Sequence, residues 1–251
     1  MNWCCHCCKG TYKNTPVTDA YKCSDCGHIY RDYKGDADEY HASCYRKPNG
    51  EGTRDSEELS GGKITSLFHV NRKDICDRRV KVLQEIIDFS KENTCIDIGA
   101  GAGTFAMHLA SSYSHLHIDC CEMDPLLVEA SSQLGFNSEQ SSIFEIDSDK
   151  KYDVVFMWHV LEHILDTRKV LSVLEKITNK YSVIEVPTLV ALNGVGRRRE
   201  LKEPNTENYD GHYHYFGEKS FRALIKDSQF EIIELMEGVQ SPALLAILRK
   251  E

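Results

Sequence analysis

The stretch TCIDIGAGAGTF, residues 94–105, decides the fold of this chain. A short apolar run leads directly into three glycines, Gly99, Gly101 and Gly103. A short apolar run bounded by turn residues is typical of a buried strand. Glycines placed directly after it let the backbone turn tightly and approach a ligand closely. The stretch therefore predicts a strand, a glycine-rich loop and the beginning of a helix.

Strand-like and helix-like segments alternate on both sides of this loop. Such alternation implies right-handed crossovers and a mostly parallel sheet with helices on both faces. In the tail, two apolar segments at 230–238 and 242–250 are close enough to form a hairpin, which would add an antiparallel edge. Helices are expected at 72–90, 104–113, 125–135, 161–178 and 217–228, and further strands at 115–122, 152–158 and 181–187.

Two acidic residues make the glycine loop more specific. Asp97 ends the first strand, and Glu122 ends the next strand 25 residues later. Ligands of open α/β sheets bind at the carboxyl ends of the strands, and an acid there can accept both hydroxyls of a ribose. The loop reads G-x-G-x-G, with Thr104 where a dinucleotide fingerprint has its last glycine. An adenosine ligand without phosphates therefore fits better than NAD, and a plain strand–helix turn is the alternative.

Three segments together resemble the class I S-adenosylmethionine-dependent methyltransferase family. They are IDIGAGAGTFAMHLA (96–110), CCEMDPLLVEASSQLGF (120–136) and KYDVVFMWHVLEHILD (151–166), and the resemblance covers about residues 72–251. It implies an α/β, Rossmann-like fold with a seven-stranded, mostly parallel sheet and an antiparallel C-terminal hairpin strand. It also implies S-adenosylmethionine as the cofactor.

The resemblance carries a set of cofactor-binding residues. In this family the glycine loop wraps the methionine part, the acid ending the second strand holds the ribose, and the residue after that acid lies near the adenine. Two residues after the third strand align with the position that contacts the adenine amine, and the end of the fourth strand faces the methyl donor. The implied residues are Asp97, Gly99, Ala100, Gly101, Gly103, Glu122, Met123, Ser142, Ile143 and Trp158.

The string HVLEH, residues 159–163, matches the H-x-x-E-H pattern of some zinc hydrolases. The resemblance favours another interpretation, because the string directly follows the fourth strand, where the family often has a Leu-Glu-His triplet. Glu162 and His163 are then expected to cap and pack the following helix. Some quinone-type O-methyltransferases with a similar segment are thought to bind a divalent metal there.

Methyl transfer to a hydroxyl or carbon acceptor benefits from a general base, most often histidine. The candidates are His214, His159 and His212, in that order. His212 and His214 belong to GHYHYF, which resembles the H-x-H-x-F stretch of the family. A packing role for the histidines of this stretch is the alternative.

The N-terminal segment is rich in cysteine: six of the eleven cysteines lie in the first 26 residues. Two C-x-x-C pairs about 15 residues apart have the spacing of a tetrahedral zinc site, and a closed set of four thiolates is structural rather than catalytic. Glycine follows the second cysteine of both pairs. His6 or His28 could substitute for a cysteine, the overlapping pair Cys4/Cys7 is a second choice, and free or redox thiols are the alternative to metal. The predicted zinc ligands are Cys5, Cys8, Cys23 and Cys26.

These patterns divide the chain into a zinc-binding segment (1–34), a polar linker or lid (35–71) and a methyltransferase domain (72–251). Tyr40 and Tyr45 of the linker are candidates to cover the cofactor. No run of 18 apolar residues predicts a membrane span, and the N-terminus has no signal-like apolar region, so a cytoplasmic location is expected. The net charge of −9 argues against nucleic acid as a partner, with Arg197–Arg199 as a local exception.

The predicted function is therefore an S-adenosylmethionine-dependent methyltransferase acting on a small-molecule or sugar acceptor, at oxygen or carbon. A cysteine-rich head before such a domain resembles methyltransferases of bacterial sugar and polysaccharide biosynthesis. One alternative is an RNA base methyltransferase guided by the zinc segment, which the acidic charge balance disfavours. Another is a catalytically silent adaptor protein, which the complete glycine loop and Glu122 disfavour. The sequence does not predict an oligomeric state.

Overall fold

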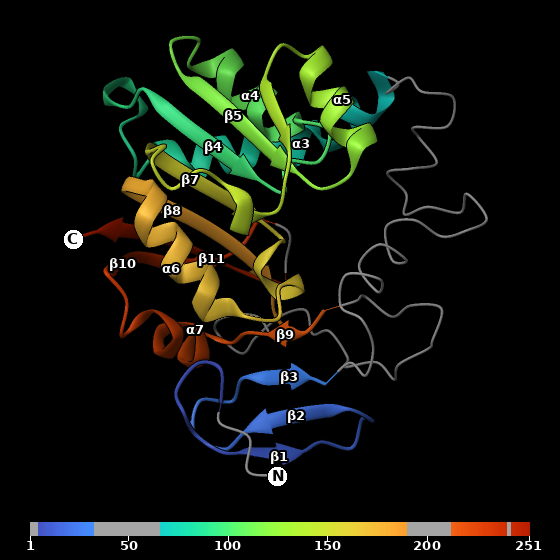
Figure 1. Cartoon of the computed structure of the whole chain (residues 1–251), viewed down its shortest axis with the longest axis vertical. Helices are drawn as coiled ribbons and strands as arrows, with labels where there is room; N and C mark the ends of the chain where they lie inside the picture. The colour runs from blue at the N-terminus through green and yellow to red at the C-terminus, as the bar shows by residue number, and fades with distance from the viewer. Residues whose placement is uncertain (1–4, 33–65, 190–211, 240–241) are drawn as a thin grey trace. The chain divides into compact units, whose positions relative to one another are not determined.

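The computed structural model describes residues 5–32, 66–189, 212–239 and 242–251 (Figure 1). The predicted lid tyrosines, the Arg197–Arg199 run and most of the predicted linker lie outside these residues. The chain forms two compact units, which are described separately. The glycine-loop unit comprises residues 42–158 and 176–182, and the cysteine unit comprises 1–41, 159–175 and 183–251.

The principal sheet has seven strands in the order β10-β11-β8-β7-β4-β5-β6. β4 pairs in parallel with both β5 and β7, and β5 pairs in parallel with β6. β10 and β11 form the antiparallel hairpin that the tail predicts. The predicted fold class is thus confirmed. The strands are β4 Thr94–Ile98, β5 His117–Glu122, β6 Asn137–Gln140, β7 Tyr152–Trp158, β8 Thr178–Pro187, β10 Phe230–Glu237 and β11 Ala243–Lys250.

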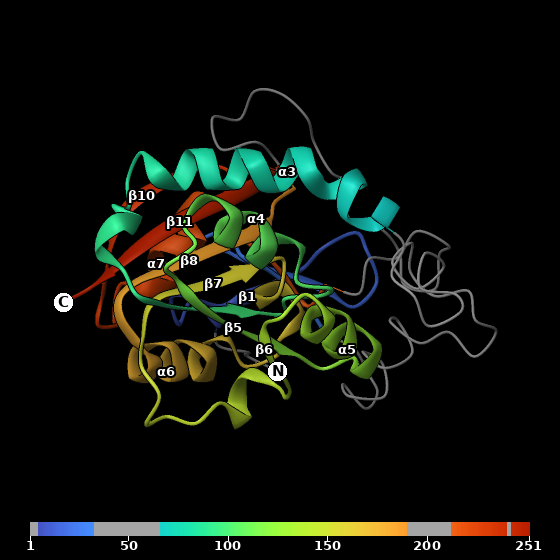
Figure 2. The same ribbon diagram turned by 90° about the horizontal axis from the view of Figure 1, so that it is seen from above.

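In the glycine-loop unit, helix α3 (Ser66–Gln84) packs along helix α4 (Thr104–Ser112), as Figure 2 shows. Helix α5 (Pro125–Gln133) follows β5, and its bounds agree with the predicted helix within two residues. α3 differs from the predicted helix 72–90 at both ends. It begins inside the predicted linker and ends at Gln84. A separate 3-10 turn follows at Phe89–Lys91, where the Asp88 side chain accepts a hydrogen bond from the Ser90 amide.

The start of α4 requires a glycine. Gly103 is the N-cap of the helix and has a φ of 74°, in the left-handed region that favours glycine. A Cβ atom at this position would lie 2.9 Å from the Cβ of Ser131. Backbone conformation and close packing therefore both exclude a larger residue, and this fixes the path of the loop from β4 into the helix.

The cysteine unit contains a second, antiparallel sheet that the sequence did not predict. Its order is β1-β2-β3-β9, and these strands lie side by side in Figure 1. The first three strands come from the cysteine-rich segment, whereas β9 comes from the GHYHYF stretch nearly 200 residues later. The strands are β1 Tyr12–Asn14, β2 Ala20–Cys23, β3 Ile29–Arg31 and β9 His214–Tyr215.

The single helix predicted at 161–178 is wrong in detail. Leu161–His163 form a 3-10 turn, and helix α6 begins separately at Thr167 and ends at Ile177. The break occurs because the Asp166 side chain accepts a hydrogen bond from the Lys169 amide and caps the new helix. The last helix, α7, spans Glu218–Ile225. None of the helices in the described part of the chain is long and apolar enough to cross a bilayer.

We predict that Gly103→Ala destabilises the protein more than Gly135→Ala. Both glycines have positive φ, 74° and 93°, but a Cβ at Gly135 would meet no atom within 4 Å in the part of the chain that the structure describes. Both variants should therefore lose about 1–2 kcal/mol through backbone strain. Gly103→Ala should lose a further ~1–3 kcal/mol through overpacking against Ser131. Urea unfolding of the two variants measures the difference, and equal losses would contradict the packing account.

Candidate functional site

The glycine loop lies at the carboxyl ends of β4 and β5. The register pairs Asp97 with Cys120 and Ile98 with Cys121, so the two strands end level with each other. The amides of Gly99 and Ala100 both donate to the Cys121 carbonyl, at 2.8 and 3.2 Å. These bonds turn the chain across the strand ends, where ligands of open α/β sheets bind.

The Glu122 carboxylate is bonded to this loop. Its Oε2 accepts from the Gly101 amide at 2.9 Å, and its Oε1 accepts from the amides of Met123 and Asp124 at 2.7 and 3.0 Å. Burial raises the pKa of Glu122, while these three hydrogen bonds oppose the rise. A Cβ at Gly101 would meet no atom of the described residues within 4 Å. The carboxylate thus fixes the position of the glycine loop through its hydrogen bonds.

Asp97 is a buried acid with an unsatisfied oxygen. Its side chain is 1% exposed, and its Oδ1 has no hydrogen-bond partner among the described residues. Burial raises the pKa of Asp97 to about 7, although the positive charge of Arg79 opposes the rise. A buried polar atom without a partner costs free energy. A donor supplied by a ligand would remove that cost.

Arg79 is a site residue that the sequence analysis missed. It belongs to α3, is 8% exposed, and its guanidinium lies 4.2 Å from the centroid of the Trp158 ring. Trp158 also meets the edge of Phe105, at a centroid distance of 4.7 Å. Its position in the sequence could have identified it: Arg79 lies four residues before Leu83, so a charged side chain falls on the apolar face of the helix.

The residues predicted near the adenine lie after β5 and β6. Met123, directly after β5, is 57% exposed. Ser142 follows β6, and its amide and hydroxyl both donate to the Glu145 carboxylate at 2.8 Å. Ile143 is buried. All predicted cofactor-binding residues therefore lie in the glycine-loop unit, at or next to the carboxyl ends of β4, β5, β6 and β7.

In the cysteine unit, four residues form what we call the histidine cluster: His159, Glu162, His163 and His212. His159 has a φ of 56°, rare for a residue with a side chain, and its amide donates to the Glu185 carbonyl at 2.8 Å. Its Nε2 lies 3.0 Å from Glu185 Oε1, and its Nδ1 lies 3.5 Å from Glu162 Oε1. Burial alone would lower the pKa of His159, but these two carboxylates raise it to about 9.

Glu162 is the centre of the cluster. Its side chain is fully buried, and its Oε1 lies 3.9 Å from His163 Nε2 and 4.0 Å from His212 Nε2. Burial would raise the pKa of Glu162, but the hydrogen bond from His159 and the charges of the histidines hold it below its ordinary value. Ligand atoms of Glu162, His163 and His212 all lie within 4.8 Å of one another. The cluster could therefore share protons or hold a divalent cation.

His214, the first-ranked base candidate, lies elsewhere in the same unit. It is fully buried, its ring stacks on His28 at a centroid distance of 5.2 Å, and its Nε2 lies 3.0 and 3.1 Å from the carbonyl oxygens of Ile164 and Leu165. Burial and the neighbouring histidines hold the pKa of His214 well below its ordinary value. The structure thus brings His159 and His212 together around Glu162 and gives His214 the contacts of a packed residue.

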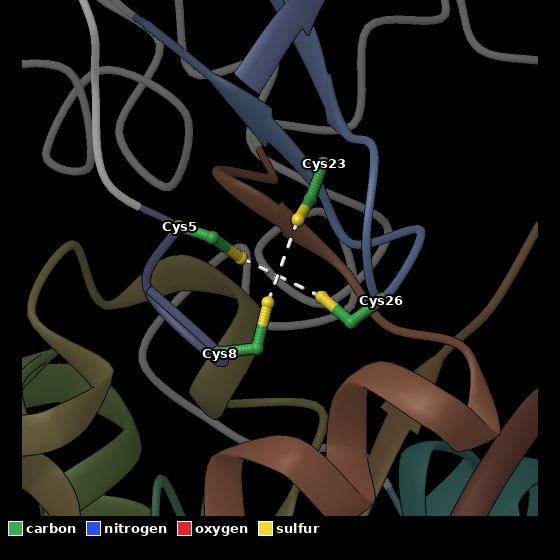
Figure 3. A group of neighbouring side chains, drawn as sticks. All are labelled: Cys5, Cys8, Cys23 and Cys26. Atoms are coloured by element: carbon green, nitrogen blue, oxygen red, sulfur yellow. Dashed lines mark hydrogen bonds between the residues drawn. The ribbon is translucent and has the colours of Figure 1, made fainter. Parts of the chain in front are cut away.

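The four predicted zinc ligands converge on one point, as Figure 3 shows. The sulfur atoms of Cys5 and Cys26 are 3.5 Å apart, as are those of Cys8 and Cys23. Sulfurs bound tetrahedrally at about 2.3 Å from zinc lie about 3.8 Å from one another, so the spacing suits that ion. Cys5, Cys7 and His28 form an overlapping second group, and Cys4 lies outside the described residues.

Comparison with known proteins gives the family. The sequence profile described as "Methyltransferase domain" matches residues 68–235. The ubiquinone biosynthesis O-methyltransferase of Rickettsia conorii is 30% identical over 132 residues, which cover 48% of this chain and 46% of that protein. Phosphoethanolamine N-methyltransferase 2 of Caenorhabditis elegans is 28% identical over 104 residues, 38% of this chain and 24% of that protein.

Human N-acetylserotonin methyltransferase in complex with S-adenosylmethionine shares the fold, with a TM-score of 0.58 and 16% identity over 86% of this chain and 60% of that chain. The profile covers well over half of the residues, and the chain therefore belongs to the methyltransferase-domain family. The matched regions span less than half of the length of the two curated relatives.

Proposed function

We propose that this protein transfers a methyl group from S-adenosylmethionine to a small-molecule or sugar acceptor, at oxygen or carbon. The observation that carries the proposal is the arrangement of Asp97, the glycine loop and Glu122 at the carboxyl ends of β4 and β5. This is where a sheet of this type binds a nucleoside. Membership of the methyltransferase-domain family supports S-adenosylmethionine as that nucleoside.

The residues present fit this cofactor. Glu122 is suited to accept hydrogen bonds from the ribose hydroxyls, and Met123 offers an exposed apolar surface to the adenine. The unsatisfied Oδ1 of Asp97 is a matching partner for the ammonium of the methionine part. The positive charge of Arg79, which acts on Asp97, suits the carboxylate of the methionine part. When bound, the cofactor supplies a methyl group already activated by the sulfonium. The main task of the protein is then to position the acceptor for in-line attack.

The two curated relatives, a ubiquinone biosynthesis O-methyltransferase and a phosphoethanolamine N-methyltransferase, support a small acceptor. The net charge of −9 supports the same choice over RNA. For the acceptor proton, the contacts favour His212 among the three candidate bases. The two carboxylates beside His159 raise its pKa to about 9, whereas burial and the neighbouring histidines hold the pKa of His214 well below its ordinary value.

For the cysteine cluster we infer one structural zinc ion bound by Cys5, Cys8, Cys23 and Cys26. The convergence of four sulfurs supports this ion, since four thiolates close its coordination sphere. Thiolate ligands persist in a reducing compartment, in agreement with the predicted cytoplasmic location.

Cofactor affinity should depend on pH through Asp97. Its pKa of about 7 in the free protein should fall when an ammonium binds beside it, so binding favours the ionised form. Affinity for S-adenosylhomocysteine should therefore rise with pH up to about 7 and then level off, by at most about tenfold per pH unit. Asp97→Asn should make the affinity nearly independent of pH. Glu122→Ala should weaken binding by ~1–3 kcal/mol. Calorimetry from pH 5.5 to 8 measures the affinity of both variants and of wild type. Unchanged affinity in both variants, or binding of NAD instead, would refute the cofactor site.

Replacing His212 by Ala should lower kcat by about 10²–10⁴ with little change in cofactor affinity, because a general base acts in the transition state. His214→Ala should instead lower the melting temperature and preserve turnover per folded molecule. His117→Ala, at an exposed position where β5 begins, serves as the control. The assay uses labelled cofactor with the best acceptor from a panel of phenolic acids and sugar nucleotides. If the His159, His212 and His214 variants all stay within about threefold of wild type, no histidine base operates.

Elemental analysis should find one zinc per chain, and X-ray absorption should show about four sulfur ligands near 2.3 Å. Replacing Cys23 and Cys26 together by Ser should release the metal, whereas Cys76→Ser, at a buried cysteine of α3, should retain it. A nitrogen-rich shell would contradict the four-cysteine assignment. Metal retained in the double variant would place it elsewhere, with Glu162, His163 and His212 as the first alternative.

A further inference from the structure

Strand β9 depends on the cysteine-rich segment for its place in a sheet. It has only two residues, and in the described part of the chain it is the edge strand whose sheet neighbour is β3. The register pairs Ile29 with Tyr215 and Tyr30 with His214, and the Arg31 amide donates to the Tyr213 carbonyl at 2.8 Å. So short a strand does not persist without its partner.

The same strand also binds the turn that carries Glu162. The Tyr213 amide donates to the Glu162 carbonyl at 2.9 Å. The His214 ring bonds the next part of the turn, with Nε2 at 3.0 Å from the Ile164 carbonyl oxygen and 3.1 Å from that of Leu165. β9 therefore joins β3 to the turn, and His212 precedes β9 by two residues.

His28 connects this strand to the cysteine cluster. It is fully buried, its Nδ1 lies 2.6 Å from Tyr12 Oη, and its Nε2 lies 3.3 Å from His214 Nδ1. The proton positions follow from the partners. His214 must donate from Nε2 to the two carbonyls, so its Nδ1 accepts from His28 Nε2. The Nδ1 of His28 then accepts from the Tyr12 hydroxyl. Every donor has an acceptor along this row, from Tyr12 to the 162–165 turn.

The cysteine loop itself is attached to the helix that follows the turn. Arg168, in the first turn of α6, donates from Nε to the His6 carbonyl at 3.0 Å and from Nη2 to the Cys7 carbonyl at 2.5 Å. These carbonyls lie between Cys5 and Cys8, two of the inferred zinc ligands. The cysteine loop and the turn before α6 are thus connected twice, through β9 and through Arg168.

We propose that the zinc-bound cysteine segment assembles the histidine cluster, and that His28 is the positioning residue that transmits its order through His214 to the 162–165 turn. The segment has three strands of three or four residues and is too small to be stable without its metal. Loss of the metal should release β9, and with it the placement of His212 beside Glu162. The inference rests on the proposed zinc site and deepens the proposed function, because it makes a structural metal necessary for turnover.

The test compares His28→Leu, which removes both hydrogen bonds at little change in volume, with His28→Gln, which can restore the donor to His214. Lys13→Ala, at an exposed position of β1, is the matched control. Each full-length variant is measured for zinc content, for S-adenosylhomocysteine affinity by calorimetry and for amide hydrogen exchange. We expect His28→Leu to keep one zinc and to bind S-adenosylhomocysteine within about twofold of wild type. Its residues 159–165 and 212–216 should exchange at least tenfold faster, and His28→Gln should recover much of that protection.

With an acceptor from the screen, His28→Leu should lower kcat at least tenfold with little change in the KM for the cofactor. Removal of zinc from the wild-type protein by a chelator should reproduce the faster exchange even if His28→Leu fails to fold. The proposal would be overturned if residues 159–165 and 212–216 exchanged at the wild-type rate in folded His28→Leu or in the wild-type protein after zinc removal. The exchange and affinity measurements need no acceptor, so they decide this inference even if the acceptor class proposed above is wrong.

Discussion

The carboxylate of Glu122 is the constraint on which the candidate cofactor site depends. It accepts three backbone amide hydrogens, one from the glycine loop and two from the chain that leads into α5. Because these bonds join the loops after two neighbouring strands, the ends of β4 and β5 form one rigid edge. Gly101, whose amide bonds Glu122, has a φ of 55°, in the left-handed region that favours glycine. Asp97 then lies beneath this edge, buried and with an oxygen available to a ligand.

A second constraint acts in the cysteine unit. Glu162 is a fully buried carboxylate surrounded by imidazole nitrogens at 3.5–4.0 Å. A buried charge of this kind is costly unless nearby groups compensate it, so its neighbours cannot move independently. His159 and His163 lie within four residues of Glu162 in the sequence, whereas His212 lies 50 residues after it. The cysteine-rich segment supplies β3, the strand that pairs with β9 just after His212.

Elements with local signals could be predicted from the sequence. Helix α5 has Pro125 in its first turn, and the side chain of Asp124 accepts a hydrogen bond from the Leu126 amide, so its start is encoded within three residues. The glycine loop and Glu122 were singled out by their positions after two predicted strands together with the family resemblance, and the four converging cysteines by their C-x-x-C spacing. The 3-10 turn at Leu161–His163 was missed because its apolar pattern continues smoothly into α6.

The remaining features depend on contacts between distant residues. Strands β1, β2, β3 and β9 have two to four residues each, too few for a periodic pattern, and β9 is defined only by its pairing with β3. Arg79 and Glu185 became site residues only when folding placed them beside Trp158 and His159. The resemblance to the H-x-H-x-F stretch made His214 a candidate base but gave no decisive order among the three histidines. The contacts of His214 with His28 could not be predicted from that stretch.

The central claim is that the edge formed by Asp97, the glycine loop and Glu122 delivers a methyl group from S-adenosylmethionine. The most direct measurement is a transfer assay with cofactor labelled in the methyl group, run with wild-type protein and Glu122→Ala against phenolic acids, sugar nucleotides and RNA. We predict that label appears in a phenolic or sugar acceptor and that the Glu122→Ala variant loses most of this transfer at limiting cofactor. Label in RNA alone would contradict the acceptor class. Absence of both cofactor binding and label transfer in the wild-type protein would contradict the account as a whole.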